Sequence, residues 1–481
     1  MRCFWRVSGC WLAAMALMAG PAIPAARAET TLIQALTQVY QGNPRLLAAR
    51  ARARAVDETV PEALAGWRPK LNATASTGFK AVRTEDDDQN ANTSRVALTL
   101  DQPLNTGGAV AAEVDAAKRR VLAQHADLRA IEQEILLETA VTYAAVYRDQ
   151  LILGFALENE QRLLQQLTIV RGRHDGGAVT DTDLAQAESR YEGAISERIQ
   201  AKADLMASGA AYRRIVGQPP EDLSTPLPLA RVPLSEADAL SKSAYHPALI
   251  AAQEAFEASR FDVDRAQSEL RPKFLLRGEV SHVDQPSTLI DRETSASIST
   301  ILTIPFYQGG GASARVRRSR QTVTERRYLV DDTRLAVEAQ VVEGWQALVA
   351  AKARARSLEA QLDAALLALT GVQAEADIGL RTISDVLDAE RELFTVQVET
   401  ARLLRDHVVA SYQLKAAVGD LSVAALELET APYAPNQHYD AVRDKWFGTG
   451  DAVEDQGLTP EGDRQWQDRY WFLRMLNRLE G

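Results

Sequence analysis

Cysteine is almost absent from this chain. The only two, Cys3 and Cys10, lie in an N-terminal stretch that begins with a basic segment, continues with an apolar segment and ends in small residues at Ala26-Arg27-Ala28. This pattern is typical of a secretory signal peptide, so we expect residues 1–28 to be removed. The mature chain would then have no disulfide, no thiolate metal ligand and no lipid-bearing cysteine at its start.

Long apolar runs, positive charge and enzyme motifs are also lacking. After the signal peptide, no apolar run approaches the roughly 20 residues of a membrane-spanning helix. The formal net charge of −11 argues against a nucleic-acid partner. The six histidines show no metal-ligand spacing, and the glycines at 309–311 lack the lysine of a phosphate-binding loop, which favours a strand-to-helix bend there. We therefore expect neither catalysis nor a cofactor.

What the chain does contain is one long internal repeat. The pair Asn43-Pro44 returns as His246-Pro247, about 200 residues later. A unit of this length that occurs twice is too long for a solenoid repeat and indicates two structural halves. Further landmarks return in the same order, namely Arg68-Pro69-Lys70 as Arg271-Pro272-Lys273, Pro103 as Pro305, Ala187-Glu188 as Ala389-Glu390 and Val216-Gly217 as Val418-Gly419.

Each half is predicted to contain short helices, two strands, a very long helix, a turn and a second long helix. The predicted strands alternate apolar and polar side chains over about ten residues, the length that a tilted strand needs to cross a bilayer. Polar loops, Arg83–Thr93 and Asp284–Thr294, are expected to join them. The first half is predicted to span 29–217, with strands at about 70–104 and long helices at about 109–217. The second half is predicted to span 218–425, with strands at about 273–306 and long helices at about 311–419. A C-terminal extension, 426–481, is expected to be partly ordered or disordered.

The long helices carry a coiled-coil pattern. The segment from Gly311 to about Ala376 is predicted to be one helix. From Val330 to Ala376 its apolar residues recur in alternating steps of three and four, with Arg334 and Gly344 as the two misfits. This period of 3.5 predicts packing against an antiparallel partner, Ile383–Val418. A plain soluble coiled coil would explain the helices but not the strands. Four strands cannot close a barrel alone, so several chains must share one or the strands must pack on something else.

Several motifs carry a family resemblance over the mature chain to about Val423. They are the two helix starts at Asn43-Pro44 and His246-Pro247, the strand entries at 66–69 and 270–272, and above all the turn at 379–389. Together they resemble the TolC family of outer-membrane channel proteins. The resemblance implies a mixed fold, with long antiparallel coiled-coil helices forming an α-helical barrel and a transmembrane β-barrel shared by a homotrimer, four strands from each protomer. It also implies outer-membrane lipid around the strands, helices that extend into the Gram-negative periplasm, and two partners, a periplasmic adaptor protein and an inner-membrane ABC or proton-driven transporter.

The second helix turn holds the candidate site. Asp385 and Asp388 are three residues apart and share one helix face. In the trimer that the resemblance implies, they would form two rings of carboxylates that favour cations, and crowding would raise some of their pKa values. Asp183 aligns with Asp385 in the first half, whereas Gln186 aligns with Asp388. An alternative is that these acids only cap a helix that begins after Thr382.

The resemblance assigns further roles near the two turns. Arg381 and Asp183 would form a latch that holds neighbouring coils together and closes the entrance. The best-known member of the family also has a tyrosine in this latch, where the present chain has Ala376. The turns at Gly176, Gly177, Gly379 and Leu380 would dock the adaptor.

The resemblance predicts a passive exit duct of a tripartite export system. The stretch Glu58–Pro69 resembles the type I protein-secretion branch of the family more than the lipidated drug-efflux branch, which favours protein secretion as the task. Two alternatives remain, a duct for multidrug or other small-molecule efflux and a periplasmic coiled-coil adaptor that forms no channel.

Overall fold

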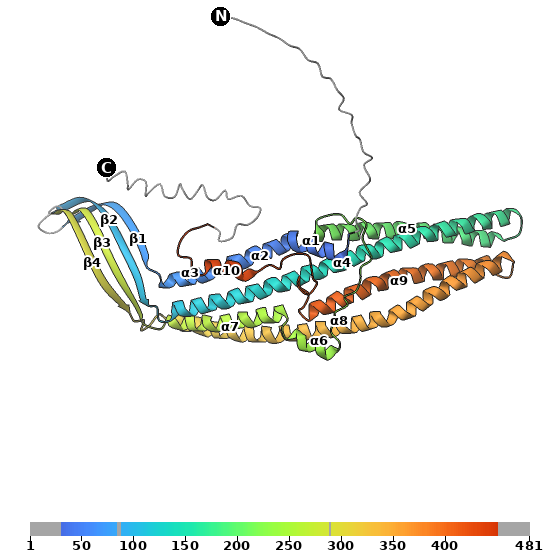
Figure 1. Ribbon diagram of the computed structural model, residues 1–481. Helices are drawn as coiled ribbons and strands as arrows, with labels where there is room; N and C mark the ends of the chain where they lie inside the picture. The colour runs from blue at the N-terminus through green and yellow to red at the C-terminus, as the bar shows by residue number, and fades with distance from the viewer. Residues whose placement is uncertain (1–29, 84–87, 288–289, 451–481) are drawn as a thin grey trace, which may run out of the picture.

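The computed structural model describes residues 30–83, 88–287 and 290–450. The predicted signal peptide and the last residues of the C-terminal extension, 451–481, lie outside this part of the chain. The molecule is a long rod of helices with a β-sheet at one end and two helix turns at the other (Figure 1). None of the helices described combines the length and apolar character needed to cross a lipid bilayer.

The element order repeats across the two halves, as predicted. The first half contains α1 (Leu32–Gly42), α2 (Pro44–Asp57), α3 (Thr59–Leu64), β1 (Lys70–Arg83), β2 (Asp88–Asn105), α4 (Ala109–Asp175) and α5 (Asp181–Val216). The second half contains α6 (Glu236–Ser243), α7 (Pro247–Ser268), β3 (Lys273–Ser287), β4 (Ile290–Thr303), α8 (Gly311–Asp377) and α9 (Ile383–Ala417), and α10 (Pro435–Val442) follows.

The coiled-coil prediction is confirmed. α8 has 67 residues, so at 1.5 Å per residue it is roughly 100 Å long. Its predicted seam residues Val341 and Leu348 are buried, and Ala351 and Leu358 pack against Val396 and Leu403 of α9. α4 and α5 form the equivalent antiparallel pair. Burial of this apolar seam therefore holds each pair of helices together.

Gly344, a misfit in the heptad pattern, is required by close helix packing. A Cβ atom at this position would lie 3.2 Å from the Cα and 3.4 Å from the backbone nitrogen of Leu414 in α9. Backbone atoms cannot move aside as a flexible side chain does. The break in the pattern therefore marks a close approach of the α8 and α9 backbones, not a weak point of the coil.

We predict that Gly344→Ala destabilises the protein by about 1–3 kcal/mol, because the added methyl group overpacks this contact. Gly371→Ala in the same helix is the matched control, since a Cβ there meets nothing within 4 Å. The control should stabilise the protein by about 0.5–1 kcal/mol through helix propensity. Denaturant unfolding followed by circular dichroism measures both. Equal stabilisation by the two substitutions would contradict the close approach.

The four strands form one antiparallel sheet in the order β1-β2-β3-β4. They contain 14, 18, 15 and 14 residues, so the predicted length of about ten was too short. Much of the predicted loops Arg83–Thr93 and Asp284–Thr294 is paired strand, with Thr93 opposite Gly78 and Thr294 opposite His282. These segments are polar on both faces, so they lack the alternation by which a half-apolar strand is recognised, although their backbones still pair.

Proline acts differently at the ends of β2 and β4. The sequence predicted that Pro103 ends the first strand pair, but β2 continues to Asn105 with a shift in register after Pro103. β4 ends at Thr303, short of the predicted end at Phe306. Proline donates no hydrogen bond and is tolerated in a sheet at an irregularity, as at Pro103, or beyond a strand end, as at Pro305.

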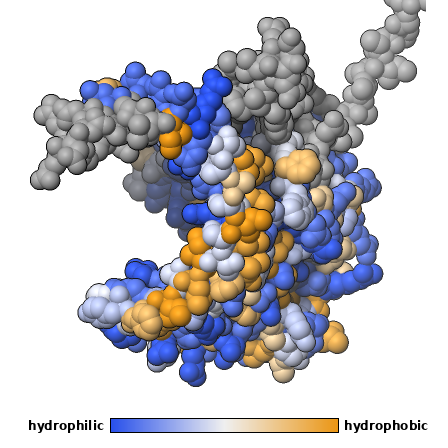
Figure 2. Space-filling model, turned by 90° about the vertical axis from the view of Figure 1, so that its left-hand side faces the viewer, coloured by the Kyte–Doolittle hydropathy of each residue, from blue (hydrophilic) through white to orange (hydrophobic). Residues whose placement is uncertain are grey.

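The two faces of the sheet differ in polarity. One face carries ion pairs between neighbouring strands: Arg277 binds Asp101 through two hydrogen bonds of 2.7 and 3.0 Å, and Arg95 binds Glu279 at 2.5 Å. On the other face, apolar side chains are exposed. A band of hydrophobic side chains crosses the sheet when it is viewed from its end (Figure 2). Val96, Leu98, Leu100, Ile298 and Leu302 are among the exposed ones.

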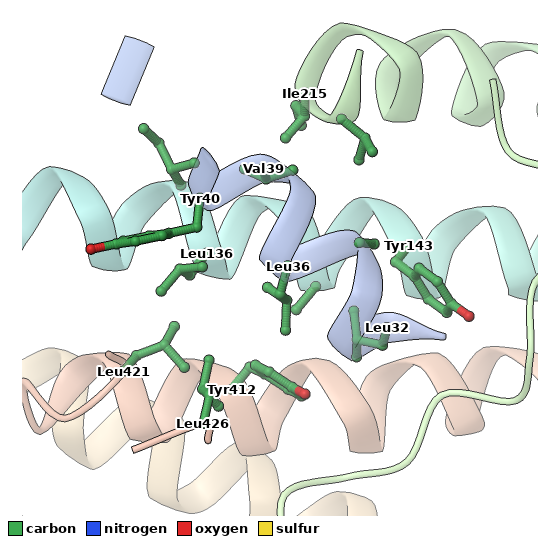
Figure 3. Close-up of a cluster of buried hydrophobic side chains, with 14 of the residues drawn as sticks. Leu32, Leu36, Val39, Tyr40, Leu136, Tyr143, Ile215, Tyr412, Leu421 and Leu426 are labelled. Carbon is green, nitrogen blue, oxygen red and sulfur yellow. The ribbon is translucent and has the colours of Figure 1, made fainter. Parts of the chain in front are cut away.

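The main hydrophobic core lies midway along the rod, where α1 packs on α4 and α5 and its buried side chains share one cluster with residues of α9. Leu36 of α1 is fully buried, and Leu32 and Leu36 point toward Tyr412 of α9 (Figure 3). Leu426 joins this cluster from the C-terminal extension. The beginning of that extension is therefore packed on the helices.

Candidate functional site

The turn between α4 and α5 is built by glycine and a helix cap. Gly177 adopts a φ of +74°, and the backbone N–H of Ala178 donates to the carbonyl of Arg173 at 2.8 Å. Thr180 then caps α5 in a reciprocal pair with Asp183, whose carboxylate accepts from the Thr180 backbone N–H at 3.0 Å. This hydrogen bond holds the pKa of Asp183 below its usual range. The predicted latch residue therefore has a structural role within its own turn.

The turn between α8 and α9 follows the same plan. Gly379 has a φ of +80°, and the N–H of Leu380 donates to the carbonyl of Glu375 at 2.8 Å. Thr382 caps α9 in a reciprocal pair with Asp385, whose carboxylate accepts from the Thr382 backbone N–H at 2.9 Å. That hydrogen bond lowers the pKa of Asp385. Within the protomer, the pKa of Asp385 is thus lowered, whereas crowding of carboxylates was expected to raise it. The contacts of Asp385 are those of a helix cap, as the alternative prediction states.

The predicted latch partners are engaged with other groups in the protomer. The guanidinium of Arg381 binds Glu375, which lies in the last turn of α8, at 2.7 Å, and Asp183 binds Thr180. The structure therefore brings Arg381 and Glu375 together, and not Arg381 and Asp183. Ala376, which the resemblance places in the latch, has no polar side-chain atom to add to either pair.

Other residues connect the two coiled coils. Asp388 of α9 pairs with Arg190 of α5 at 2.8 Å, and the hydroxyl of Ser384 donates to the side-chain oxygen of Gln186 at 2.7 Å. Asp388 is therefore distinct from Asp385: one carboxylate reaches across to the other coil, and the other caps its own helix. Both lie within two turns of the tip.

A buried contact reinforces this connection farther from the tip. Glu390 of α9 is 1% exposed and accepts from Arg162 of α4 at 2.7 Å and from the amide of Gln373 of α8 at 3.1 Å. The carboxylate joins three helices and both coiled coils. Burying it without a cation would be very unfavourable, so Arg162 fixes the distance between the coils.

The internal repeat explains why this contact exists in one half only. Glu188 is the repeat equivalent of Glu390, and it pairs with Arg171 of its own coil at 2.9 Å, with both side chains about half exposed. The equivalent of Arg171 is Gln373, which is neutral. Glu390 thus lacks a cation in its own coil and takes Arg162 from the other one. The replacement of Arg171 by the neutral Gln373 in the second half was a signal for this contact that the sequence analysis missed.

We predict that Arg162→Met lowers the free energy of unfolding by on the order of 3 kcal/mol, because it leaves Glu390 buried and unpaired. Arg171→Met is the matched control and removes the exposed pair of the other half, worth about 1 kcal/mol or less. Thermal or denaturant unfolding of the purified variants gives both values. Equal losses would show that Glu390 does not depend on Arg162.

A pH-sensitive contact lies in the first turn. His174 Nε2 is 2.8 Å from Asp181 Oδ1, and this hydrogen bond raises the pKa of His174 above its ordinary value of 6.5. The imidazolium form stabilises the turn, so the gain is complete below that ordinary value and is lost as pH rises through the folded pKa.

Hydrogen exchange of residues 176–181, corrected for intrinsic rates, should therefore be slower at pH 6 than at pH 9. His174→Gln should remove this pH dependence. A turn that is equally protected at both pH values in the unsubstituted protein would contradict the assignment.

Comparison with known proteins identifies the family of this chain. A family model described as outer membrane efflux protein matches residues 35–218 and 242–420, once in each half. The chain belongs to this family. The outer membrane efflux protein BepC of Brucella suis biovar 1 is 34% identical over 441 residues, which cover 91% of this chain and 96% of BepC. The alkaline protease secretion protein AprF of Pseudomonas aeruginosa is 24% identical over 383 residues, covering 77% and 78% of the two chains.

A solved structure has the same fold. The CmeC outer membrane channel of Campylobacter jejuni matches with a TM-score of 0.75 over 86% of this chain and 89% of CmeC, at 14% identity. Membership of the outer membrane efflux protein family makes this chain a non-enzymatic transport protein, a channel of tripartite efflux systems. It resides in the outer membrane and extends into the periplasm. This excludes the alternative of a periplasmic adaptor.

Proposed function

We propose that three copies of this chain assemble into a passive exit duct. The main observation behind this proposal is that the sheet is open. β1 and β4 each have one edge without a partner among the described residues. In lipid every backbone N–H and C=O needs a partner, so such edges must be paired. Pairing β4 of one copy with β1 of the next would close a twelve-stranded barrel from three copies. The long helices would continue it as a tunnel.

The entrance of this duct would be the end of the rod at the two helix turns. We propose that Asp385 and Asp388 of the three copies surround the opening there and favour cations. The family resemblance motivates this assignment, and the position of both residues near the tip supports it. The pairing of Asp388 with Arg190 reduces the negative charge that this residue adds, so Asp385 would contribute more to selectivity.

We predict that Asp385→Ala and Asp388→Ala each lower the ratio of cation to anion permeability in planar bilayers. Asp385→Ala removes negative charge from the opening, and Asp388→Ala leaves the positive charge of Arg190 uncompensated there. Reversal potentials in a salt gradient measure the ratio. Glu325→Ala, a substitution in α8 about 50 residues from the turn, serves as the control. Unchanged selectivity in both aspartate variants would refute the proposed ring.

We propose that contacts between the coils hold the entrance closed at rest. Arg190→Ser removes the contact from α5 to Asp388, and Arg381→Ser removes the latch that the family resemblance assigns. We predict a higher single-channel conductance for each variant. Arg198→Ser is the control, because Arg198 binds Glu160 inside the first coil and joins no second coil. A conductance equal to that of the control would refute the role of the residue concerned.

For the cargo we propose type I protein secretion, with a periplasmic adaptor docked at Gly176, Gly177, Gly379 and Leu380. The similarity to AprF, whose name states protease secretion, supports this choice. Small-molecule efflux is the second candidate, favoured by the greater similarity to BepC. Deletion of the gene should remove one or more proteins from the culture medium. Unchanged medium proteins together with increased drug sensitivity would establish the efflux alternative instead.

A further inference from the structure

The described C-terminal residues 430–450, here called the strap, lie outside both halves and have no part in the proposed duct. The strap is attached to the first half at three places. At the first, the guanidinium of Arg50 lies between two aromatic rings, 4.5 Å from the centroid of Tyr40 and 5.0 Å from that of Tyr433. The backbone N–H of Tyr433 also donates to the Tyr40 hydroxyl at 2.7 Å.

The second attachment is a buried carboxylate shared by two histidines. Asp57 is 1% exposed, and its two oxygens lie 2.8 Å from His125 Nε2 and 3.0 Å from His438 Nδ1. His438 belongs to α10, whereas His125 belongs to α4. Val442, one turn after His438, is fully buried. The middle of the strap is therefore fixed in position rather than lying loosely on the surface.

The third attachment is at the base of the sheet. The guanidinium of Arg68 donates to the carbonyl of Lys445 at 2.7 Å and lies 4.8 Å from the ring of Trp446. The contacts thus pair positions 50, 57 and 68 with positions 433, 438 and 446, in the same order. The strap consequently runs parallel to α2 and α3, toward the sheet (Figure 1).

This path ends with aromatic side chains in the open. Trp446 is 65% and Phe447 88% exposed, and the neighbouring Trp67 is 38% exposed. Gln102 of β2 donates to the Trp67 carbonyl at 2.9 Å, and β1 begins at Lys70. We call Trp67, Trp446 and Phe447 the aromatic patch. It lies at the end of the sheet where β1 begins, beside the strands that are proposed to meet lipid.

We propose that the aromatic patch inserts into the periplasmic leaflet of the outer membrane, so that the strap is a second membrane anchor besides the strands. This inference rests on the proposed function. Trp and other aromatic side chains are favoured at membrane interfaces, where the ring is buried and polar groups stay hydrated. Arg68 and Lys70 lie beside the patch and suit the phosphate groups of phospholipids. An exposed aromatic group of this kind in water would otherwise be unfavourable.

Single spin labels test the depth of the strap. Cys3 and Cys10 are the only cysteines of the chain and lie in the predicted signal peptide, so each variant offers one reactive thiol. We would label Phe447→Cys, with Asn436→Cys on the exposed side of α10 as the aqueous control and Ile298→Cys, 83% exposed in β4, as the membrane control. The protein is reconstituted in phospholipid vesicles, and relaxation by oxygen and by a water-soluble nickel chelate is compared.

The label at 447 is expected to lose nickel relaxation relative to 436 and to approach the oxygen relaxation at 298. Nickel relaxation at 447 equal to that at 436 would overturn the proposal while leaving the duct intact. Weak relaxation by both reagents would place the patch against a second copy and would also overturn it. A label at 298 that is fully open to nickel would instead contradict the proposed barrel.

Discussion

The structure depends on a sheet that is incomplete in one copy. Its apolar residues are exposed, and both outer edges, β1 and β4, lack partners among the described residues. A soluble protein normally protects such edges, whereas a membrane allows only a closed barrel. The long helices follow the strands closely, since α4 begins four residues after the end of β2 and α8 begins eight residues after the end of β4. Association through the strands would therefore also align the helices of neighbouring copies into a tunnel.

The two coiled coils of one copy are not equivalent, and the inequality is concentrated near the tip. Their seams are apolar and similar. In the first coil, Glu188 is exposed and pairs with Arg171, whereas its equivalent in the second coil, Glu390, is buried. Glu390 then depends on Arg162 of the other coil. The ion pair between Arg162 and Glu390 restrains how far the two coils can separate, because a hydrogen-bonded ion pair depends on distance and angle. A purely apolar contact depends less on direction. In the proposed duct, Arg162 and Arg190 would limit opening from within each protomer.

Much of the fold could be predicted from the sequence because its signals are periodic and local. The 3.5-residue period gave the long helices, with boundaries within two residues of those observed. The caps at Thr180 and Thr382 follow from adjacent residues. The full strand lengths could not be predicted, because the outer parts of the strands are polar on both faces. The contacts of Arg190 and Arg162 could not be predicted either, since they depend on how two supercoiled pairs rotate against each other.

The strap shows the same limit. Its aromatic residues were visible in the sequence, but Asp57 and His438 are separated by 381 positions, and no pattern links them. The family model ends at residue 420, so the resemblance gave no guide to this segment. Only the folded chain shows that it runs toward the sheet.

The most direct test of the account is the mass of the purified protein in detergent, measured by light scattering with the detergent contribution subtracted. The account predicts a particle of three chains that precipitates when detergent is withdrawn. A single chain that stays dissolved without detergent would contradict it, because the edges of the sheet would then need no partner.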